Sequence, residues 1–319
     1  MENKNKAAVS LLFLSPIIAE MLSGSTTPLE FLNPIALALL LGLYGTSVLL
    51  IHEFKVRYKL GYASVLMLGF AYGVLEEGIA TKSFFDPYWP DCADFLCQFG
   101  RFAGVNWVWS IGLTIYHGLW SILVPIVIVE ILFHEVFDET WFSRKSIMVL
   151  TAILITDVVL IHMFISSFYI GAIELSASIL AIFIISIYAL LSGRKLSEKQ
   201  ITSKKMFLKA LLISSAFFIV FYAISYVLKM PLLTIALELI IAYQIYTMAK
   251  QLDYICTTYE CKAAFASGPI LVLSALAILQ GFGGKSDMFI AATLGLLLII
   301  LVKNKAKQAS FLQINIRKI

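Results

Sequence analysis

Apolar runs long enough to cross a lipid bilayer recur along almost the whole chain, separated by short polar or turn-forming segments. A transmembrane helix needs about 20 such residues. Windows of about 19 residues, bounded by charges or turn signals, predict ten spans. These lie at residues 7–22, 34–52, 61–80, 105–132, 147–167, 170–192, 207–228, 231–249, 263–281 and 287–302. The pattern therefore predicts an all-α fold, a polytopic bundle of about ten transmembrane helices.

The composition limits what such a chain can be. Of its 319 residues, 60% are hydrophobic and 14% are charged, and the mean hydropathy is +0.91. Soluble domains carry about 25% charged residues, so this composition excludes ordinary soluble domains, disordered chains, coiled coils and nucleic-acid-binding proteins with a basic face. We expect one integral membrane domain over residues 1–319, located in the cell membrane, with the lipid bilayer as its partner and no nucleic acid.

The basic residues predict the orientation of the bundle. With the N-terminus inside, only four of the 24 lysines and arginines fall on the outer side, and the other 20 fall on the inner side. The four are Lys82, Arg101, Lys229 and Lys285. Inner loops of membrane proteins carry such an excess of Lys and Arg, so we expect both termini inside. The net charge of +4 is then mostly an inner basic rim facing anionic lipid.

The four cysteines form two pairs with the same C-x4-C spacing, Cys92 with Cys97 and Cys256 with Cys261. The predicted topology places the pairs on opposite sides of the membrane, which excludes a single four-cysteine zinc site. On the outer side, Cys92 and Cys97 are either a local disulfide or two thiols. On the inner side, Cys256 and Cys261 are predicted to be reduced thiols.

Ionisable groups inside the spans are the candidates for chemistry. Seven of the 20 acidic residues lie within or at the rim of predicted spans: Glu20, Glu76, Glu77, Glu130, Asp157, Glu174 and Glu238. An unpaired carboxylate in hydrocarbon costs several kcal/mol, so each is protonated, hydrogen-bonded or facing a wet cavity. For Glu130, Glu174 and Glu238 we keep the structural interpretation, a neutral acid hydrogen-bonded to a neighbouring helix.

The remaining polar groups concentrate at the outer ends of the first five spans. Four residues are the catalytic candidates: Glu76, Glu77, His117 and His162. Four more are candidates for binding substrate: Glu20, Arg101, Asn106 and Asp157. We therefore predict one outward-opening site in residues 1–167, and a supporting half with five spans in residues 168–319.

Helical spacing supports this site. In the fourth span a polar stripe recurs at intervals of three and four: Asn106, Ser110, Thr114, His117 and Ser121. Such a stripe should face other helices or water rather than lipid; hydrogen bonding between helices by small hydroxyl residues is the alternative interpretation. In the third span, Gly69 and Gly73 form a G-x-x-x-G motif that Glu77 continues, so close backbone approach should press Glu77 against a neighbouring helix.

A pair of glutamates at a helix end, followed by a histidine on each of the next two long helices, resembles the CAAX-protease and bacteriocin-processing (CPBP) family of glutamate-dependent intramembrane proteases. In that family an E-E-x-x-x-R motif supplies the glutamate that activates water. Later F-x-x-x-H and H-x-x-x-N/D motifs help to bind the water and to stabilise the oxyanion. The resemblance covers residues 70–166 and implies these roles for Glu76, Glu77, His117 and His162.

The motifs also depart from the family pattern. Thr81 stands in the arginine position, with Lys82 after it, Leu113 replaces the phenylalanine, and Ser166 occupies the N/D position. Family members usually present the site to the cytosol, whereas the predicted topology faces it outward. The substrate class of the family is therefore not carried over.

Three functions compete. The first is a membrane-embedded hydrolase acting on a membrane or lipid-soluble substrate, in which Glu76 or Glu77 is the general base and His117 and His162 polarise the scissile carbonyl. The aromatic-rich segment 81–109 would be its lid or platform. No metal is assigned; a zinc-binding form of this site is an alternative, although the H-E-x-x-H spacing is missing.

The second function is a proton- or cation-coupled secondary transporter, which should bring acids of both halves, including Glu174 and Glu238, to the middle of the membrane. The third is a non-catalytic scaffold whose acids lock helix contacts. The arrangement of Glu76, Glu77 and His117 distinguishes these functions, because a hydrolase should cluster them within reach of one water or ion.

Overall fold

In the computed structural model, which describes residues 2–92, 94–191 and 201–316, nearly every described residue outside the short connections is helical. Nine helices of the described chain are long and apolar enough to span a membrane. Five of them are single helices: α9 Arg144–Phe164, α10 Ala172–Leu191, α13 Pro231–Tyr254, α14 Tyr259–Phe282 and the first 24 residues of α15 Met288–Ile316. The other four each contain a π-helical segment. They are Pro34–Tyr58 (α3 Pro34–Leu40, π-helical Leu41–Gly45, α4 Thr46–Tyr58), Tyr62–Ala80 (α5 Tyr62–Val74, π-helical Leu75–Ala80), Trp107–Leu132 (α7 Trp107–Tyr116, π-helical His117–Leu123, α8 Val124–Leu132) and Ser203–Leu228 (α11 Ser203–Phe218, π-helical Ile219–Ile224, α12 Ser225–Leu228). The predicted all-helical membrane fold is confirmed.

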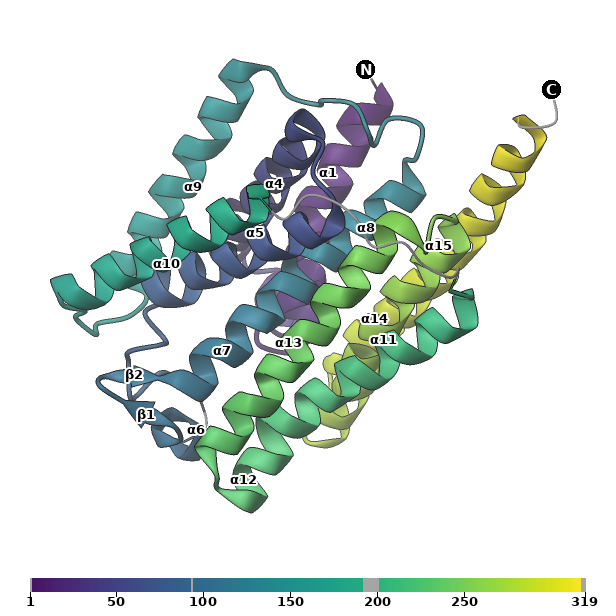
Figure 1. Ribbon diagram of the computed structural model, residues 1–319. Helices are drawn as coiled ribbons and strands as arrows, with labels where there is room; N and C mark the ends of the chain where they lie inside the picture. The colour runs from purple at the N-terminus through teal and green to yellow at the C-terminus, as the bar shows by residue number, and fades with distance from the viewer. Residues whose placement is uncertain (1, 93, 192–200, 317–319) are drawn as a thin grey trace.

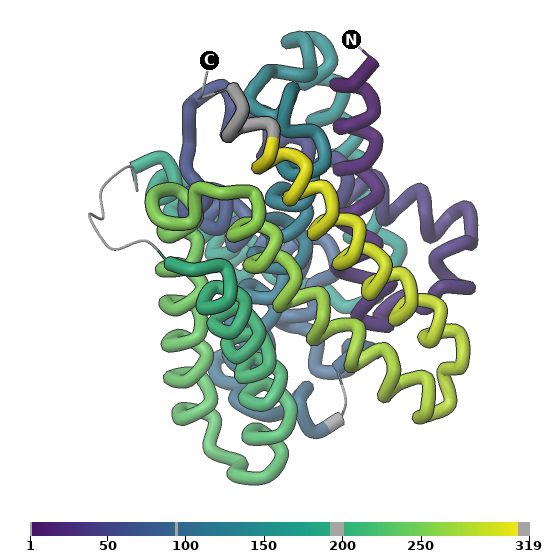
Figure 2. The backbone as a smooth tube through the Cα atoms, turned by 90° about the vertical axis from the view of Figure 1, so that its right-hand side faces the viewer, coloured from purple at the N-terminus to yellow at the C-terminus, as the bar shows by residue number. Residues whose placement is uncertain are grey.

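The first predicted span is also a helix. It consists of α1 Glu2–Pro16 and the π-helical segment Ile17–Met21, and its charged ends separate it from the nine apolar helices. α1 begins at the end of the bundle where α15 finishes (Figures 1 and 2). α1 packs against the π-helical segment Leu41–Gly45, α4 and α8. Which end faces the cytoplasm stays a prediction.

The long segment between the third and fourth spans folds over the end of the bundle opposite the termini (Figure 1). It contains α6 Asp94–Gln98 and a two-stranded antiparallel hairpin of β1 Arg101–Phe102 and β2 Val105–Asn106. A short helix, α2 Pro28–Phe31, follows the first span and contacts α15. The long segment covers the end of the bundle at which we placed the candidate site.

Two glycines determine how closely α5 approaches the fourth span. A Cβ on Gly69 would lie 2.8 Å from Cα of Gly118, and a Cβ on Gly73 would lie 3.2 Å from Cβ of His117. The close backbone approach predicted from the G-x-x-x-G motif is therefore confirmed. This span, Trp107–Leu132, is the most buried of the nine, with 94% of its most apolar part inside the bundle. Its polar stripe therefore faces protein rather than lipid.

At the periphery, α9 and α10 have only 11% of their most apolar windows buried. Most of their exposed side chains are Ile, Leu, Val, Met or Phe, which suits contact with lipid tails. On the other side of the bundle, α14 packs between α11 and α15. The division into a site half and a supporting half stays a prediction.

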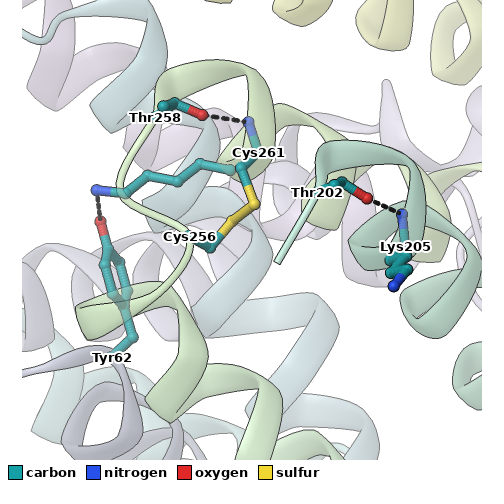
Figure 3. Close-up of a disulfide and its surroundings, with 7 residues drawn as sticks. Tyr62, Thr202, Lys205, Cys256, Thr258 and Cys261 are labelled. Atoms are coloured by element: carbon teal, nitrogen blue, oxygen red, sulfur yellow. Dashed lines mark hydrogen bonds between the residues drawn. A yellow bond between two sulfur atoms is a disulfide. The ribbon is translucent and has the colours of Figure 1, made fainter. Parts of the chain in front are cut away.

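The cysteines correct one prediction. Cys256 and Cys261 form a disulfide, with their Cα atoms 5.4 Å apart, whereas we expected reduced thiols. Cys256 follows the end of α13 and Cys261 lies in the first turn of α14, where its N–H donates to Oγ1 of Thr258 (Figure 3). The tight connection between the two helices therefore brings the thiols together. Cys92 and Cys97 are both buried thiols, and Sγ of Cys97 donates to the carbonyl of Cys92.

Candidate functional site

Glu76, Glu77 and His117 converge in one buried cluster. Nε2 of His117 lies 3.0 Å from Oε1 of Glu77, and Nδ1 lies 3.1 Å from Oε2 of Glu76. Each side chain offers one atom that could bind a metal ion, and these three atoms lie within 4.8 Å of one another. All three residues are less than 10% exposed. The structure thus brings together three of the four catalytic candidates, from two different helices.

Hydroxyl groups hold this cluster in place. Oε2 of Glu77 accepts hydrogen bonds from Oγ1 of Thr81, at 3.0 Å, and from Oγ of Ser83. Nε1 of Trp109 donates to the same Ser83 oxygen at 3.0 Å. These contacts leave the other oxygen of Glu77, Oε1, directed at His117. Because the carboxylate is anchored on one side only, it is positioned for chemistry on the other.

The imidazole ring is oriented by its own helix. Nδ1 of His117 lies 3.0 Å from Oγ of Ser121, one turn along the chain. A hydroxyl, an imidazole and a carboxylate in line form the arrangement of a nucleophilic triad. Ser121, however, is fully buried and does not line the cavity described below. It therefore serves to orient His117 rather than to attack a substrate.

Tyrosines surround the imidazole on its remaining sides. The rings of Tyr44, Tyr72 and Tyr116 have their centroids 5.9, 5.8 and 5.5 Å from that of His117. The Tyr44 hydroxyl donates to Oε1 of Glu20 at 2.5 Å, and Thr26 donates to its Oε2 at 2.8 Å. Glu20, a predicted substrate-binding residue, is thereby linked to the cluster through Tyr44.

The site is built on π-helical segments. Four of the five such segments of the described chain supply a residue to the cluster or to the cavity beside it, and the fifth supplies Tyr44, which contacts His117 and Glu20. The residues are Glu20 from Ile17–Met21, Tyr44 from Leu41–Gly45, Glu76 and Glu77 from Leu75–Ala80, His117 from His117–Leu123, and Phe221 and Tyr222 from Ile219–Ile224. π-Helical turns are rare and occur mostly at functional sites. Their coincidence here marks one place in the bundle.

A cavity of about 500 Å³ adjoins the cluster, and Glu20, Glu77 and His117 line it. One wall consists of aromatic rings: Trp109, Tyr116, Phe217, Phe218, Phe221 and Tyr222. The polar wall contains Ser23, Ser25, Asp91 and Lys285 from connecting segments, and Gln280 from the last turn of α14. The cavity combines an apolar surface with ionisable groups, as binding sites for small molecules do.

Asp91 stands at the mouth of this cavity, outside the membrane-spanning helices. Loss of hydration raises the pKa of its carboxyl to about 6. The negative charges of Glu20 and Glu77 raise this pKa further, and Lys285 opposes them. Burial is thus the main cause of the raised pKa of Asp91, and the neighbouring carboxylates add to it.

The fourth catalytic candidate, His162, lies apart from the cluster. Its Nδ1 is 2.7 Å from the carbonyl oxygen of Ile79, so it ties α9 to the end of the third span. Lys82 reinforces the same contact by donating to the carbonyls of His162 and Ser166, at 2.7 and 2.8 Å. Neither His162 nor Lys82 lines the cavity.

Three substrate-binding candidates also lie away from the cavity. Arg101 donates to the carbonyls of Phe85, Asp86, Cys97 and Gly104, which holds the outer segment together. The Asn106 side chain accepts from the N–H of Trp109 and donates to the carbonyls of Leu96 and Cys97, so it caps α7. Asp157 is buried against the helix that contains Gly42.

The other intramembrane acids are separate from the cluster. Glu130 pairs with Lys262 at 2.6 Å, a structural ion pair. Glu238 is fully buried beside Gly112, and neither of its oxygens has a hydrogen-bond partner among the residues that the structure describes. Glu174 is half-buried near the start of α10. Acids of the second half are thus not part of the carboxylate–histidine group.

Several residues of the site were not identified from the sequence. Tyr72 lies four residues before Glu76 on the same helical face, and Tyr116 directly precedes His117, so helical spacing could have indicated both. Tyr44 and Ser83 carried no such signal, because their contacts with Glu20 and Glu77 join segments separated in the chain.

The cluster has donors that suit a divalent metal ion. Two carboxylates and one imidazole are ligands that zinc accepts, and catalytic zinc sites have three protein ligands and one open position. Here Glu76, Glu77 and His117 would supply those ligands, and the metal ion would activate water beside the cavity that Glu77 and His117 line.

The model of one protein family, described as an uncharacterized membrane protein family, matches residues 9–317. The chain gives no match to the CPBP family. No curated protein and no solved structure matches it. The family match covers nearly the whole chain and agrees with a multi-pass membrane protein.

Proposed function

The chain therefore belongs to this family of membrane proteins, and we propose that it is a membrane-embedded hydrolase in which Glu77 and His117 activate water. The observation that supports the proposal best is the direct contact of Glu77 with His117, at 3.0 Å, on the wall of a 500 Å³ cavity. A carboxylate and an imidazole within hydrogen-bond distance, open to a cavity, form a general acid–base pair.

In this mechanism a water molecule in the cavity attacks the carbonyl carbon of an ester or amide. Glu77 takes a proton from the water as the new C–O bond forms. His117 stabilises the oxyanion of the tetrahedral intermediate. When the intermediate collapses, the bond to the leaving group breaks and Glu77 returns the proton to the leaving group. Oε2 of Glu76 lies 3.1 Å from Nδ1 of His117, on the side of the imidazole away from Glu77, and helps to position the ring for this role.

The aromatic wall of the cavity favours a lipid-soluble substrate. Its rings form a continuous surface, with centroid distances of 5.5 Å between Trp109 and Phe221 and 5.6 Å between Phe217 and Phe221. A substrate that reaches Glu77 from the lipid or the membrane surface would place its apolar part on these rings. The resemblance to the CPBP family rests on the glutamate pair and the two histidines, and the chain gives no match to that family, so a peptide substrate is not implied.

The secondary transporter is supported less well. It requires acids of both halves to meet near the middle of the membrane. In the described chain, Glu174 and Glu238 lie outside the group formed by Glu76, Glu77 and His117. A cluster confined to two helices, next to one cavity, suits a reaction site better than an alternating-access path.

Incorporation of oxygen from labelled water tests the hydrolase without knowledge of the substrate. Purified protein in detergent would be incubated, in H₂¹⁸O, with a membrane extract that contains lipids and membrane peptides, and the products would be analysed by mass spectrometry. We expect a product that carries ¹⁸O with the wild type and is missing with Glu77→Gln. The same product in equal amount from both proteins would refute the proposal.

Glu174→Gln is the matched control, because it makes the same chemical change at a half-buried acid away from the cluster. It should give the labelled product at the wild-type rate. Both variants must also elute as the wild type does in size-exclusion chromatography, which shows that loss of product is not loss of fold.

A further inference from the structure

The charges of the cavity are unbalanced. Three carboxylates line it, Glu20, Glu77 and Asp91, against the single lysine Lys285 and the imidazole of His117, which contacts Glu77. Among the residues that the structure describes, none of the three carboxylates forms an ion pair with a lysine or an arginine. Within the same residues, Lys285 forms no ion pair with a carboxylate. Nζ of Lys285 instead donates to the carbonyl of Gly24 at 3.0 Å. The polar wall thus leaves a net negative charge to be neutralised from outside the chain.

Glu20 is held in place by two neutral hydroxyl groups. Both of its oxygens accept hydrogen bonds from neutral hydroxyls, those of Tyr44 and Thr26. Hydrogen bonds to a carboxylate stabilise its charged form, but hydroxyls supply no compensating positive charge. A cationic group in the cavity would therefore gain an attraction that nothing in the protein already satisfies.

The aromatic wall determines which kind of cation fits. Rings attract cations through their negative faces, and the attraction grows when the cation loses its water. Ring contacts run along this wall. The ring centroids are 6.4 Å apart for Tyr116 and Phe218, 5.1 Å for Phe217 and Phe218, and 4.9 Å for Phe221 and Tyr222. An organic ammonium suits such a surface better than a hydrated metal ion, because its alkyl groups bury against the rings.

We propose that the substrate is an amphiphile with an ammonium head group, held by the carboxylates of Glu20 and Asp91 and by the aromatic rings that line the same cavity. The inference rests on the proposed hydrolase function, since it identifies the substrate class of that reaction. The ammonium balances the charge of the carboxylates, the apolar chain lies toward the lipid, and the bond to be cleaved reaches Glu77 and His117.

Three probes with the same six-carbon chain test the proposal: hexyltrimethylammonium, uncharged hexan-1-ol and hexyl sulfate. Trp89 and Trp109 line the cavity and report binding through their fluorescence. We expect hexyltrimethylammonium to bind at least about tenfold more tightly than either other probe, the ratio that corresponds to one desolvated charge contact. Equal or tighter binding of hexan-1-ol or hexyl sulfate would overturn the proposal.

Variants locate the binding. Glu20→Gln and Asp91→Asn should each weaken the binding of hexyltrimethylammonium about tenfold and leave the binding of hexan-1-ol unchanged. The reason is that only the charged probe contacts the carboxylates. Glu135→Gln is the control; this exposed glutamate lines a different groove, at Asn3, His134 and Lys305. If neither Glu20→Gln nor Asp91→Asn weakens the ammonium selectively, the proposal fails.

The two proposals fail separately. Glu77-dependent incorporation of ¹⁸O into a product without an ammonium group would overturn the substrate class and leave the hydrolase standing. Selective ammonium binding without any labelled product would overturn the hydrolase and leave an ammonium-binding cavity.

Discussion

Glu77 and His117 face each other from two π-helical segments, with Oε1 of Glu77 3.0 Å from Nε2 of His117. The replacement Glu77→Gln preserves the shape of the side chain and removes its ability to accept a proton. We expect it to lower the rate of ¹⁸O incorporation about 10²- to 10⁴-fold, the usual contribution of a general base. The thermal unfolding temperature, measured in detergent, should change little.

A scaffold makes the opposite prediction for the same variant. If the acids only lock helix contacts, Glu77→Gln and His117→Ala should lower the unfolding temperature, and no catalytic rate should depend on them. Normal stability combined with loss of the labelled product would exclude the scaffold.

The second prediction concerns Gly69, which allows α5 to approach the fourth span. The new Cβ of Gly69→Ala would lie 2.8 Å from Cα of Gly118, a backbone atom that cannot turn aside. We expect this variant to lose about 1–3 kcal/mol of stability, as overpacked cores do, and to displace His117 from Glu77. Thermal unfolding measures the loss. The control is Gly283→Ala, whose nearest neighbour would be 3.4 Å away, in ordinary contact; equal destabilisation by both would contradict the packing argument.

The kinds of contact involved determine how much of this site could be predicted from the sequence. The spans could be predicted because each one is a continuous apolar run. The meeting of Glu77 with His117 could be predicted because Gly69 and Gly73 lie on the same helical row as Glu77. Both signals are local and periodic.

Other features depend on contacts between distant segments. Nothing in the sequence around His162 indicates that its ring points to the carbonyl of Ile79 rather than to the cluster. The π-helical turns shift the helical register at the functional residues, and a regular period of 3.6 residues does not predict them. The prediction for Cys256 and Cys261 was wrong because it relied on the side of the membrane, whereas the turn between α13 and α14 brings the two together.

The third prediction concerns that disulfide. It closes a loop across a sequence separation of five residues, for which the chain-entropy account gives about 2 kcal/mol of stabilisation. Cys261→Ser should lower the free energy of unfolding by this amount, and a reductant should lower that of the wild type equally. The reductant should not affect the stability of Cys261→Ser. If it destabilised that variant to the same extent, its effect would come from another site.

Removal of metal ions is the fourth prediction, and it separates the two forms of the hydrolase. With Glu77 acting directly on water, treatment with EDTA should leave the rate of ¹⁸O incorporation within about twofold, since no metal-bound water takes part. A loss of activity that Zn²⁺ restores would instead show that Glu76, Glu77 and His117 bind a metal ion.

The fifth prediction is a pH dependence of ammonium binding caused by Asp91. Its pKa is raised to about 6, first by burial and then by the negative charges of Glu20 and Glu77, with Lys285 opposing. Below pH 6 the carboxyl is neutral and above it the carboxyl is negative, so a cation gains this contact as the pH rises. We expect the affinity for hexyltrimethylammonium to increase between pH 5 and pH 7, with a midpoint at about pH 6.

The Asp91→Asn variant provides the control, because its side chain has nearly the same shape and does not titrate. Its affinity for hexyltrimethylammonium should lack the transition at about pH 6 and should equal, over the whole range, that of the wild type at low pH. Binding of hexan-1-ol should show no such transition in either protein. If the variant kept the full transition, another group would be responsible, and Asp91 would lose its assigned contact with the ammonium.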